Sequence, residues 1–158
     1  MATPFGRDLY VACDARGVTE SRFVSRPRGA TAPEPPARVR ARVRHPVLRA
    51  ALAHLDAYFA RRAPRIDVPL VLAGTDFQIA VWRTVAALPA GERASYAEVA
   101  RAIGRPNAHR GVASALGKAP LAIFVPAHRI VGADGCVRGA TEGSLRRRLL
   151  AFEARAAR

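Results

Sequence analysis

The chain has 158 residues, of which 50% are hydrophobic and 24% charged, so it can form one domain or two small ones and is too apolar for a disordered protein. It has no apolar run near the ~20 residues that a membrane-spanning helix needs, and its two cysteines are too few for a disulfide framework. We therefore expect a soluble, intracellular protein. Twenty-six basic against twelve acidic residues give a net charge of +14, which favours a polyanionic partner: nucleic acid first, an anionic membrane surface second.

The first half of the chain predicts a small α/β unit that serves as a scaffold. A hairpin is expected around a turn at residues 14–17, followed by a loop over the Pro-rich residues 27–37. Residues 45–62 carry apolar side chains at helical spacing and predict a helix. Residues 66–72 predict a short strand.

Two capping boxes open helices in the second half. Thr75 and Gln78 form the first, before a helix that ends near Leu88. Ser95 and Glu98 form the second, before a shorter helix. In each box the hydroxyl of the first residue can accept a hydrogen bond from the backbone N–H of the last residue. The side chain of the last residue can accept one in return from the backbone N–H of the first.

A third helix completes a candidate helix-turn-helix. Asn107 is expected to cap it, and a turn at residues 104–106 joins it to the helix before. Its outer face carries small residues beside Arg110, namely Ala108, Gly111, Ser114 and Gly117. Small residues let a helix backbone approach a narrow groove, which favours minor-groove contact. The alternative is that they allow close packing on another helix.

The run Pro126-Ala127-His128-Arg129, followed by two aliphatic residues, is the most specific motif in the chain. It resembles the active-site signature of the O6-alkylguanine-DNA alkyltransferases, in which the second residue is Cys. Further segments resemble that family in the same order along the chain: Thr3–Gly6, Thr75–Gln78, Val81-Trp82, Ser95-Tyr96, Ile103–Pro106, Arg110–Val112, Leu149-Leu150 and Glu153.

The resemblance implies an α+β fold in two domains. Residues 1–72 would form an N-terminal α/β domain of RNase H-like type, and residues 73–158 a helical DNA-binding domain with a helix-turn-helix of winged-helix type. The implied partner is double-stranded DNA containing O6-alkylguanine, whose base rotates from the minor-groove side into a pocket. We expect a cytoplasmic, nucleoid-associated monomer with no cofactor, no metal and no membrane partner.

The resemblance also implies site residues. Those expected to line the lesion pocket are Tyr96, Pro126, Ala127, His128, Arg129, Val131, Ala140, Thr141 and Glu153. Those expected to contact DNA are Tyr96, Asn107, Arg110, Gly111 and Ser114. In the family, the residue matching Arg110 fills the space left by the rotated base, and the residue matching Tyr96 helps to rotate the nucleotide. The residue matching Glu153 orients the His, which lowers the pKa of the acceptor thiol.

The chain departs from the family at the acceptor position. Ala127 has no nucleophilic atom, and Ala119 and Ala140 also differ from the usual residues, while Cys13 and Cys136 are expected to be inert. In these departures the chain resembles the alkyltransferase-like proteins, which lack the acceptor Cys. The resemblance implies the first prediction: a non-enzymatic protein that binds O6-alkylguanine and flags it for nucleotide excision repair, with excision repair proteins as partners. Two alternatives remain: an alkyltransferase inactivated by an engineered Cys-to-Ala change, and a basic helix-turn-helix transcription regulator.

Overall fold

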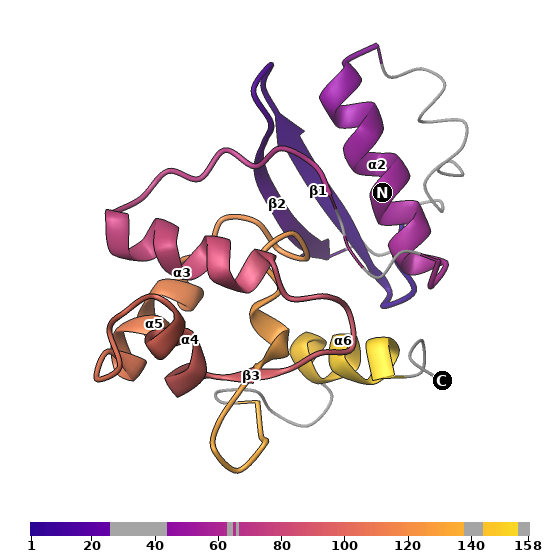
Figure 1. Cartoon of the computed structure of the whole chain (residues 1–158). Helices are drawn as coiled ribbons and strands as arrows, with labels where there is room; N and C mark the ends of the chain where they lie inside the picture. Colours follow the sequence, from indigo (N-terminus) through magenta and orange to yellow (C-terminus); the bar gives the residue numbers. More distant parts are fainter. Residues whose placement is uncertain (26–43, 63–64, 66, 138–143, 155–158) are drawn as a thin grey trace. The chain divides into compact units, whose positions relative to one another are not determined.

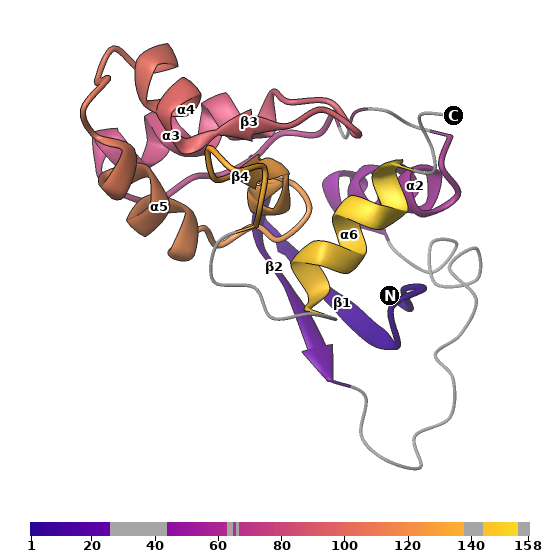
Figure 2. The same cartoon turned by 90° about the horizontal axis from the view of Figure 1, so that it is seen from below.

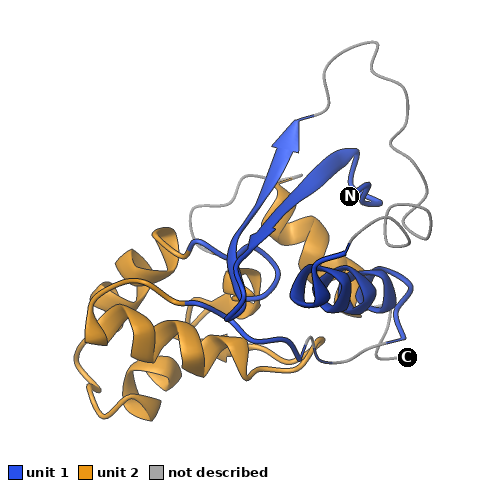
Figure 3. Cartoon of the chain, turned by 90° about the horizontal axis from the view of Figure 1, so that it is seen from above, with its two compact units in different colours: residues 1–71, 120–124 blue, residues 72–119, 125–158 orange. Residues whose placement is uncertain are grey.

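The computed structural model describes residues 1–25, 44–62, 65, 67–137 and 144–154, and it divides into two compact units (Figure 3). Unit 1 comprises Met1–Val71 and Pro120–Phe124, and unit 2 comprises Leu72–Ala119 and Val125–Arg158. The chain thus leaves unit 2, returns to unit 1 for a short segment, and re-enters unit 2. None of the helices in the described ranges is both long and apolar enough to cross a membrane.

Unit 1 is built on an antiparallel hairpin with one helix. Strands β1 (Arg7–Cys13) and β2 (Val18–Ser25) pair across the turn at 14–17, and α2 (Pro46–Phe59) contacts both strands (Figure 1). The predictions of a hairpin and of a helix near residues 45–62 are confirmed. Helix α2 buries part of its predicted apolar stripe, namely Ala51, Leu52, Leu55 and Tyr58. The loop predicted at residues 27–37 lies outside the described residues.

The strand predicted at 66–72 forms only as a single bridge at Leu70, because the outer edge of β2 is shared between two segments. Ile66 lies outside the described residues. Val18 makes a parallel bridge to Leu70, donating its N–H to the carbonyl of Pro69 at 2.8 Å. Further along β2, Ser21 bridges to Leu121. Neither partner segment therefore has enough of the edge to form a continuous ladder, and Pro69 has no N–H to offer another strand.

Three helices form a cluster in unit 2, side by side in both views (Figures 1 and 2): α3 (Asp76–Ala86), α4 (Tyr96–Ala102) and α5 (His109–Gly117). Both predicted capping boxes are present, at Thr75 and at Ser95. The indole N–H of Trp82 donates to the carbonyl of Ala115 at 2.9 Å and joins α3 to α5.

The cap predicted at Asn107 is wrong by one residue. The N-cap of α5 is Ala108, which has no side-chain capping bond, and Asn107 lies exposed in the preceding turn. The N–H of Ala108 donates to the carbonyl of Arg105, which closes this turn, and the first helical bond runs from Val112 to Ala108. The turn after α4 therefore extends past the residue with the best capping side chain.

A short parallel pairing connects the start of α4 with the Pro126–Arg129 motif. Strand β3 (Ala94–Ser95) pairs with β4 (Ile130–Val131), which directly follows a turn of 3-10 helix, η1 (Ala127–Arg129). Ser95 is the register partner of Val131, so the pairing brings Tyr96 close to the motif. Helix α6 (Leu145–Ala154) contacts η1 and buries Leu149, Leu150 and Glu153.

Candidate functional site

A buried ion cluster lies behind η1, centred on the carboxylate of Glu153. Its Oε1 accepts from His128 Nε2 at 2.7 Å and from Arg129 Nη2 at 2.8 Å. Its Oε2 accepts from Arg129 Nε at 2.9 Å and from the backbone N–H of Gly91 at 3.1 Å. Each of the three residues is at most 4% exposed. All four acceptor positions of the carboxylate are used, which is the condition for a buried ion pair to be tolerated.

Two backbone features hold the cluster in place. Gly91 has φ +89°, a left-handed conformation that glycine adopts without strain and that presents its N–H to Glu153. The guanidinium of Arg129 also donates through Nη1 to the carbonyl of Leu88. The turn that ends α3 is therefore bonded to both halves of the ion pair.

Burial sets the protonation state of His128, and its contact with Glu153 opposes that effect. Burial lowers the pKa of His128, and this outweighs the bond to Glu153 that favours the charged form. Burial alone would raise the pKa of Glu153, but the hydrogen bonds and charges of His128 and Arg129 hold it well below its usual range. The imidazole is thus neutral, with its proton on Nε2 toward Glu153, and Nδ1 is left as an acceptor.

These shifts predict that acid destabilises the fold in two steps. Unfolded His128 titrates near pH 6.5, above its folded pKa, so the unfolded chain binds the extra proton first as the pH falls. Glu153 has a folded pKa below its unfolded value and adds a second loss below about pH 5. Urea midpoints from pH 8 to pH 4 should therefore decline through both windows. His128→Asn should remove the first decline, and a midpoint constant from pH 8 to pH 5.5 in the unaltered chain would contradict the assignment.

Residue 127 directly precedes His128 in the 3-10 turn η1. Ala127 is half-buried, between the buried Pro126 and His128. Its N–H donates to the carbonyl of Val125 at 2.8 Å, and the N–H of Arg129 donates to that of Pro126 at 2.9 Å. This tight turn fixes the direction of the Ala127 side chain, which is a methyl group without acid-base or nucleophilic chemistry.

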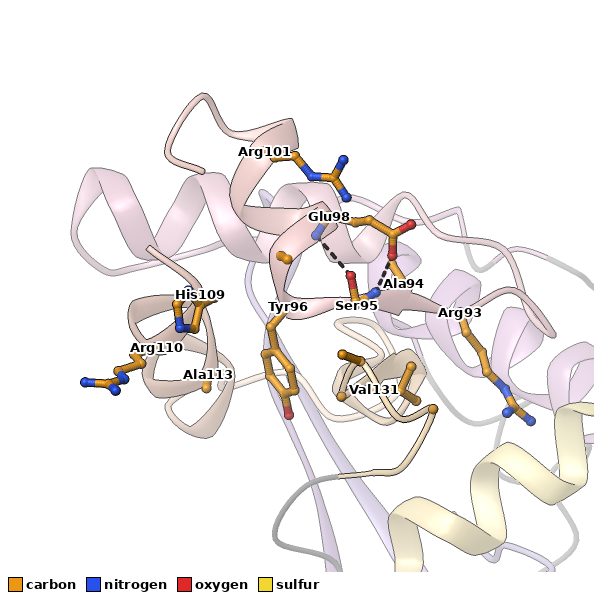
Figure 4. Close-up of a pocket in the computed structure, with 14 residues that line it drawn as sticks. Arg93, Ala94, Ser95, Tyr96, Glu98, Arg101, His109, Arg110, Ala113 and Val131 are labelled. Atoms are coloured by element: carbon orange, nitrogen blue, oxygen red, sulfur yellow. Dashed lines mark hydrogen bonds between the residues drawn. The ribbon is translucent and has the colours of Figure 1, made fainter. Parts of the chain in front are cut away.

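A surface hollow of about 650 Å³ lies on the same unit (Figure 4). Its wall is formed by β3, α4, the first turns of α5 and the turn after β4. In Figure 4 the ring of Tyr96 lies between Ala113 and Val131, while the guanidinium of Arg110 points away from that ring. Arg93 and Arg101 also line the hollow, so its rim is basic.

The structure divides the predicted pocket residues into groups. Tyr96 and Val131 line the hollow, together with Arg110 from the predicted DNA-contact set. The others that are described lie in the turn and the ion cluster and do not line the hollow: Pro126, Ala127, His128, Arg129 and Glu153. Ala140 and Thr141 lie outside the described residues. The functional roles of these residues stay predictions.

The predicted DNA-contact face of α5 is divided as well. A Cβ atom on Gly111 would lie 3.1 Å from the ring of Phe77, so this glycine allows α5 to pack closely on α3. At Gly111, therefore, the small residue allows packing on another helix, which was the alternative to minor-groove contact. Arg110 and Ser114 are exposed, and Asn107 is exposed in the turn before the helix.

Sequence reasoning missed several neighbours that only the fold brings together. Arg93 and His109 line the hollow, and Arg101 lies one helical turn after Glu98, a spacing that could have placed it on the same face as the capping box.

In unit 1, the Nδ1 of His45 lies 3.5 Å from the sulfur of Cys13. In the part of the chain that the structure describes, no three His, Cys, Asp or Glu side chains form a metal-binding group.

Comparison with known proteins identifies the family. Residues 76–155, about half of the chain, match the family described as 6-O-methylguanine DNA methyltransferase, DNA binding domain. The chain belongs to this family. The match includes η1, the ion cluster of Glu153 with all three of its hydrogen-bond partners, and the whole wall of the hollow.

Individual relatives carry methyltransferase names. The chain is 47% identical over 100 residues to a methylated-DNA--protein-cysteine methyltransferase of Mycobacterium tuberculosis, covering 63% of this chain and 61% of the relative. A Methanosarcina barkeri protein of the same name is 41% identical over 95 residues, covering 60% of each. The aligned part thus spans less than two thirds of these relatives' length.

Solved structures of one relative match nearly the whole chain. The O6-methylguanine methyltransferase of Mycobacterium tuberculosis matches with a TM-score of 0.78 and 36% identity, over 100% of this chain and 92% of that one. The same protein in complex with DNA matches with a TM-score of 0.77 and 35% identity, over 98% and 91%. The fold is therefore the mixed α/β fold of these methyltransferases.

The comparisons correct the first functional prediction. A non-enzymatic protein that binds lesions and flags them for excision repair is contradicted, because the relatives at 41–47% identity are named as methyltransferases, which are enzymes. The names support the alkyltransferase alternative better. Family membership and the mixed α/β fold expected from the resemblance are confirmed.

Proposed function

We propose that this chain is an O6-alkylguanine-DNA alkyltransferase in which Ala127 occupies the position of the alkyl-accepting Cys. The observation that carries the proposal is the neutral His128, held by Glu153 and adjacent to residue 127 in the sequence. It is found in a chain that is 47% identical over 100 residues to a named methyltransferase. A catalytic imidazole next to the acceptor needs a fixed tautomer and a free ring nitrogen. The buried ion cluster supplies both.

The chemistry of the site follows once a thiol stands at residue 127. The thiol proton passes to Nδ1 of His128, and the sulfur attacks the alkyl carbon on guanine O6. A new S–C bond forms as the C–O6 bond breaks, and the guanine takes up a proton in place of the alkyl group. The alkyl group remains on the protein, so each molecule reacts once.

The hollow and its basic rim are proposed as the DNA-facing side. The relative from Mycobacterium tuberculosis was solved in complex with DNA, and this chain has a net charge of +14. We assign α4 and α5 as a helix-turn-helix of winged-helix type and the N-terminal unit as an RNase H-like scaffold. Tyr96 would rotate the alkylated nucleotide out of the stack, and Arg110 would fill the space it leaves.

Ala127→Cys tests the proposal. The variant, incubated with a duplex that contains one O6-methylguanine labelled in its methyl group, is expected to take up about one label per molecule. Peptide mapping should place the label on the introduced Cys. The experiment is best done with Cys13 and Cys136 changed to Ser, so that no other thiol can accept the label.

Ala127→Ser is the matched control, because a hydroxyl of similar size is a far weaker nucleophile at neutral pH. It should take up no label while binding the same duplex. Absence of label on the Cys variant, with DNA binding retained, would refute the assignment of residue 127 as the acceptor position. A preference for a particular unmodified sequence over the alkylated duplex would favour a transcription regulator instead.

A further inference from the structure

The segment that leads into the Pro126–Arg129 motif is held by the N-terminal hairpin. Residues 120–124 belong to unit 1, although the residues on either side of them belong to unit 2. Leu121 makes a parallel bridge to Ser21 in the middle of β2. Only Val125 and Pro126 separate the end of this segment from Ala127.

Ser21 makes three hydrogen bonds to the segment. Its N–H donates to the carbonyl of Pro120 at 3.0 Å, and its carbonyl accepts from the N–H of Ala122 at 2.9 Å. Its hydroxyl donates to the carbonyl of Ala122 at 2.7 Å. Ser21 is 2% exposed, so these bonds are shielded from water and fix the segment strongly.

The next residue, Ile123, has an unusual backbone conformation. Its φ is +73° and the residue is 3% exposed. A β-branched residue rarely adopts the left-handed region, and it does so where the surrounding structure forces it. The backbone before Ile123 is held by the bonds at Pro120 and Ala122, and the residue after it, Phe124, is buried. The chain therefore changes direction at Ile123.

We propose that Ser21 is a positioning residue for residue 127. It holds residues 120–122 on β2, and the left-handed turn at Ile123 redirects the chain just before it continues through Val125 and Pro126 to η1. The hydroxyl of Ser21 acts through the chain itself and does not touch the substrate. This role can be tested in two ways. A measurement of alkyl transfer rests on the proposed function, whereas a measurement of backbone hydrogen exchange does not.

The transfer test uses the Ala127→Cys variant. Adding Ser21→Ala is expected to lower the single-turnover rate of methyl transfer by about tenfold, because a small displacement of the acceptor is costly to the reaction. The Kd for the alkylated duplex should stay within about twofold, since the hollow belongs to unit 2. Ser21→Thr keeps the hydroxyl and should keep the rate. Thr19→Ala, which removes a half-buried hydroxyl from the same strand, is the matched control and should leave both values unchanged.

The backbone test uses the chain with Ala127. Hydrogen exchange of the amides of Ala127 and Arg129, which close the turn of η1, should become about tenfold faster in Ser21→Ala. The amide of Val112, at the start of α5, is the internal reference and should not change. If the Ala127→Cys variant transfers no methyl group, the proposed function fails and the exchange measurement alone decides the role of Ser21.

A pair of substitutions tests the turn at Ile123. Ile123→Gly and Ile123→Ala remove the same buried side chain, but only glycine is unstrained at positive φ. The Gly variant should therefore have the higher urea midpoint, which reverses the usual order. A higher midpoint for Ile123→Ala, or equal transfer and exchange rates in Ser21→Ala and Thr19→Ala, would overturn the proposal.

Discussion

Replacing Glu153 with Ala is expected to lower the free energy of unfolding by about 3–5 kcal/mol, the range for breaking a buried ion pair from one side. The variant leaves the guanidinium of Arg129 buried without its carboxylate, and it removes the acceptor of His128 and of the Gly91 N–H. Urea unfolding followed by the fluorescence of Trp82, the only tryptophan, measures the loss.

Two further variants make this result specific. Glu20→Ala removes an exposed carboxylate paired with Arg22 and should cost less than about 1 kcal/mol. Glu153→Gln keeps an acceptor but not the charge and should fall between the two. If Glu153→Ala cost no more than Glu20→Ala, the cluster would not have the stabilising role that its burial indicates.

Elements with local signals were predictable from the sequence. The capping boxes at Thr75 and Ser95 formed as expected, because both partners of each box lie within one helical turn. The cap at Asn107 failed, because the bond from Ala108 to the carbonyl of Arg105 prolongs the turn before α5. A capping side chain is thus a weaker signal than the turn that precedes it.

Pairings between distant segments were not predictable in this way. The short strand expected at residues 66–72 had the right composition, but β2 divides its outer edge between Leu70 and Leu121. The choice between DNA contact and helix packing at Gly111 also depended on Phe77, which lies on another helix. These outcomes depend on tertiary contacts that periodicity does not encode.

One contact of the candidate site was predictable from the sequence, whereas the rest of its geometry was predictable only in part. The motif placed His128 near Glu153 through the family resemblance, and the contact is present at 2.7 Å. Arg129 was expected in the pocket, yet it binds both oxygens of Glu153, since η1 lets two neighbouring side chains reach the same carboxylate. Of the two basic residues on the rim, Arg101 could have been placed by its helical spacing from Glu98, whereas no local pattern marked Arg93.

Arg110→Ala is expected to weaken binding to a duplex with one O6-methylguanine by roughly tenfold, and binding to the unmodified duplex by much less. Arg110 is exposed at the start of α5, on the wall of the hollow, where a side chain could enter the space of a rotated base. A residue that only attracts phosphates would weaken both duplexes equally and lower the salt slope by about one. Competition between the two duplexes at several fixed salt concentrations separates these effects.

The choice of control matters for this prediction. Arg146 is unsuitable, because it is half-buried and its charge lowers the pKa of His128. Arg147 is exposed on the same helix, α6. Its replacement by Ala removes one positive charge without disturbing the ion cluster of Glu153. Arg147→Ala should change binding to the two duplexes in the same proportion. If Arg110→Ala did so too, Arg110 would be a phosphate contact, and the preference for alkylated DNA would have to come from Tyr96 and the wall of the hollow.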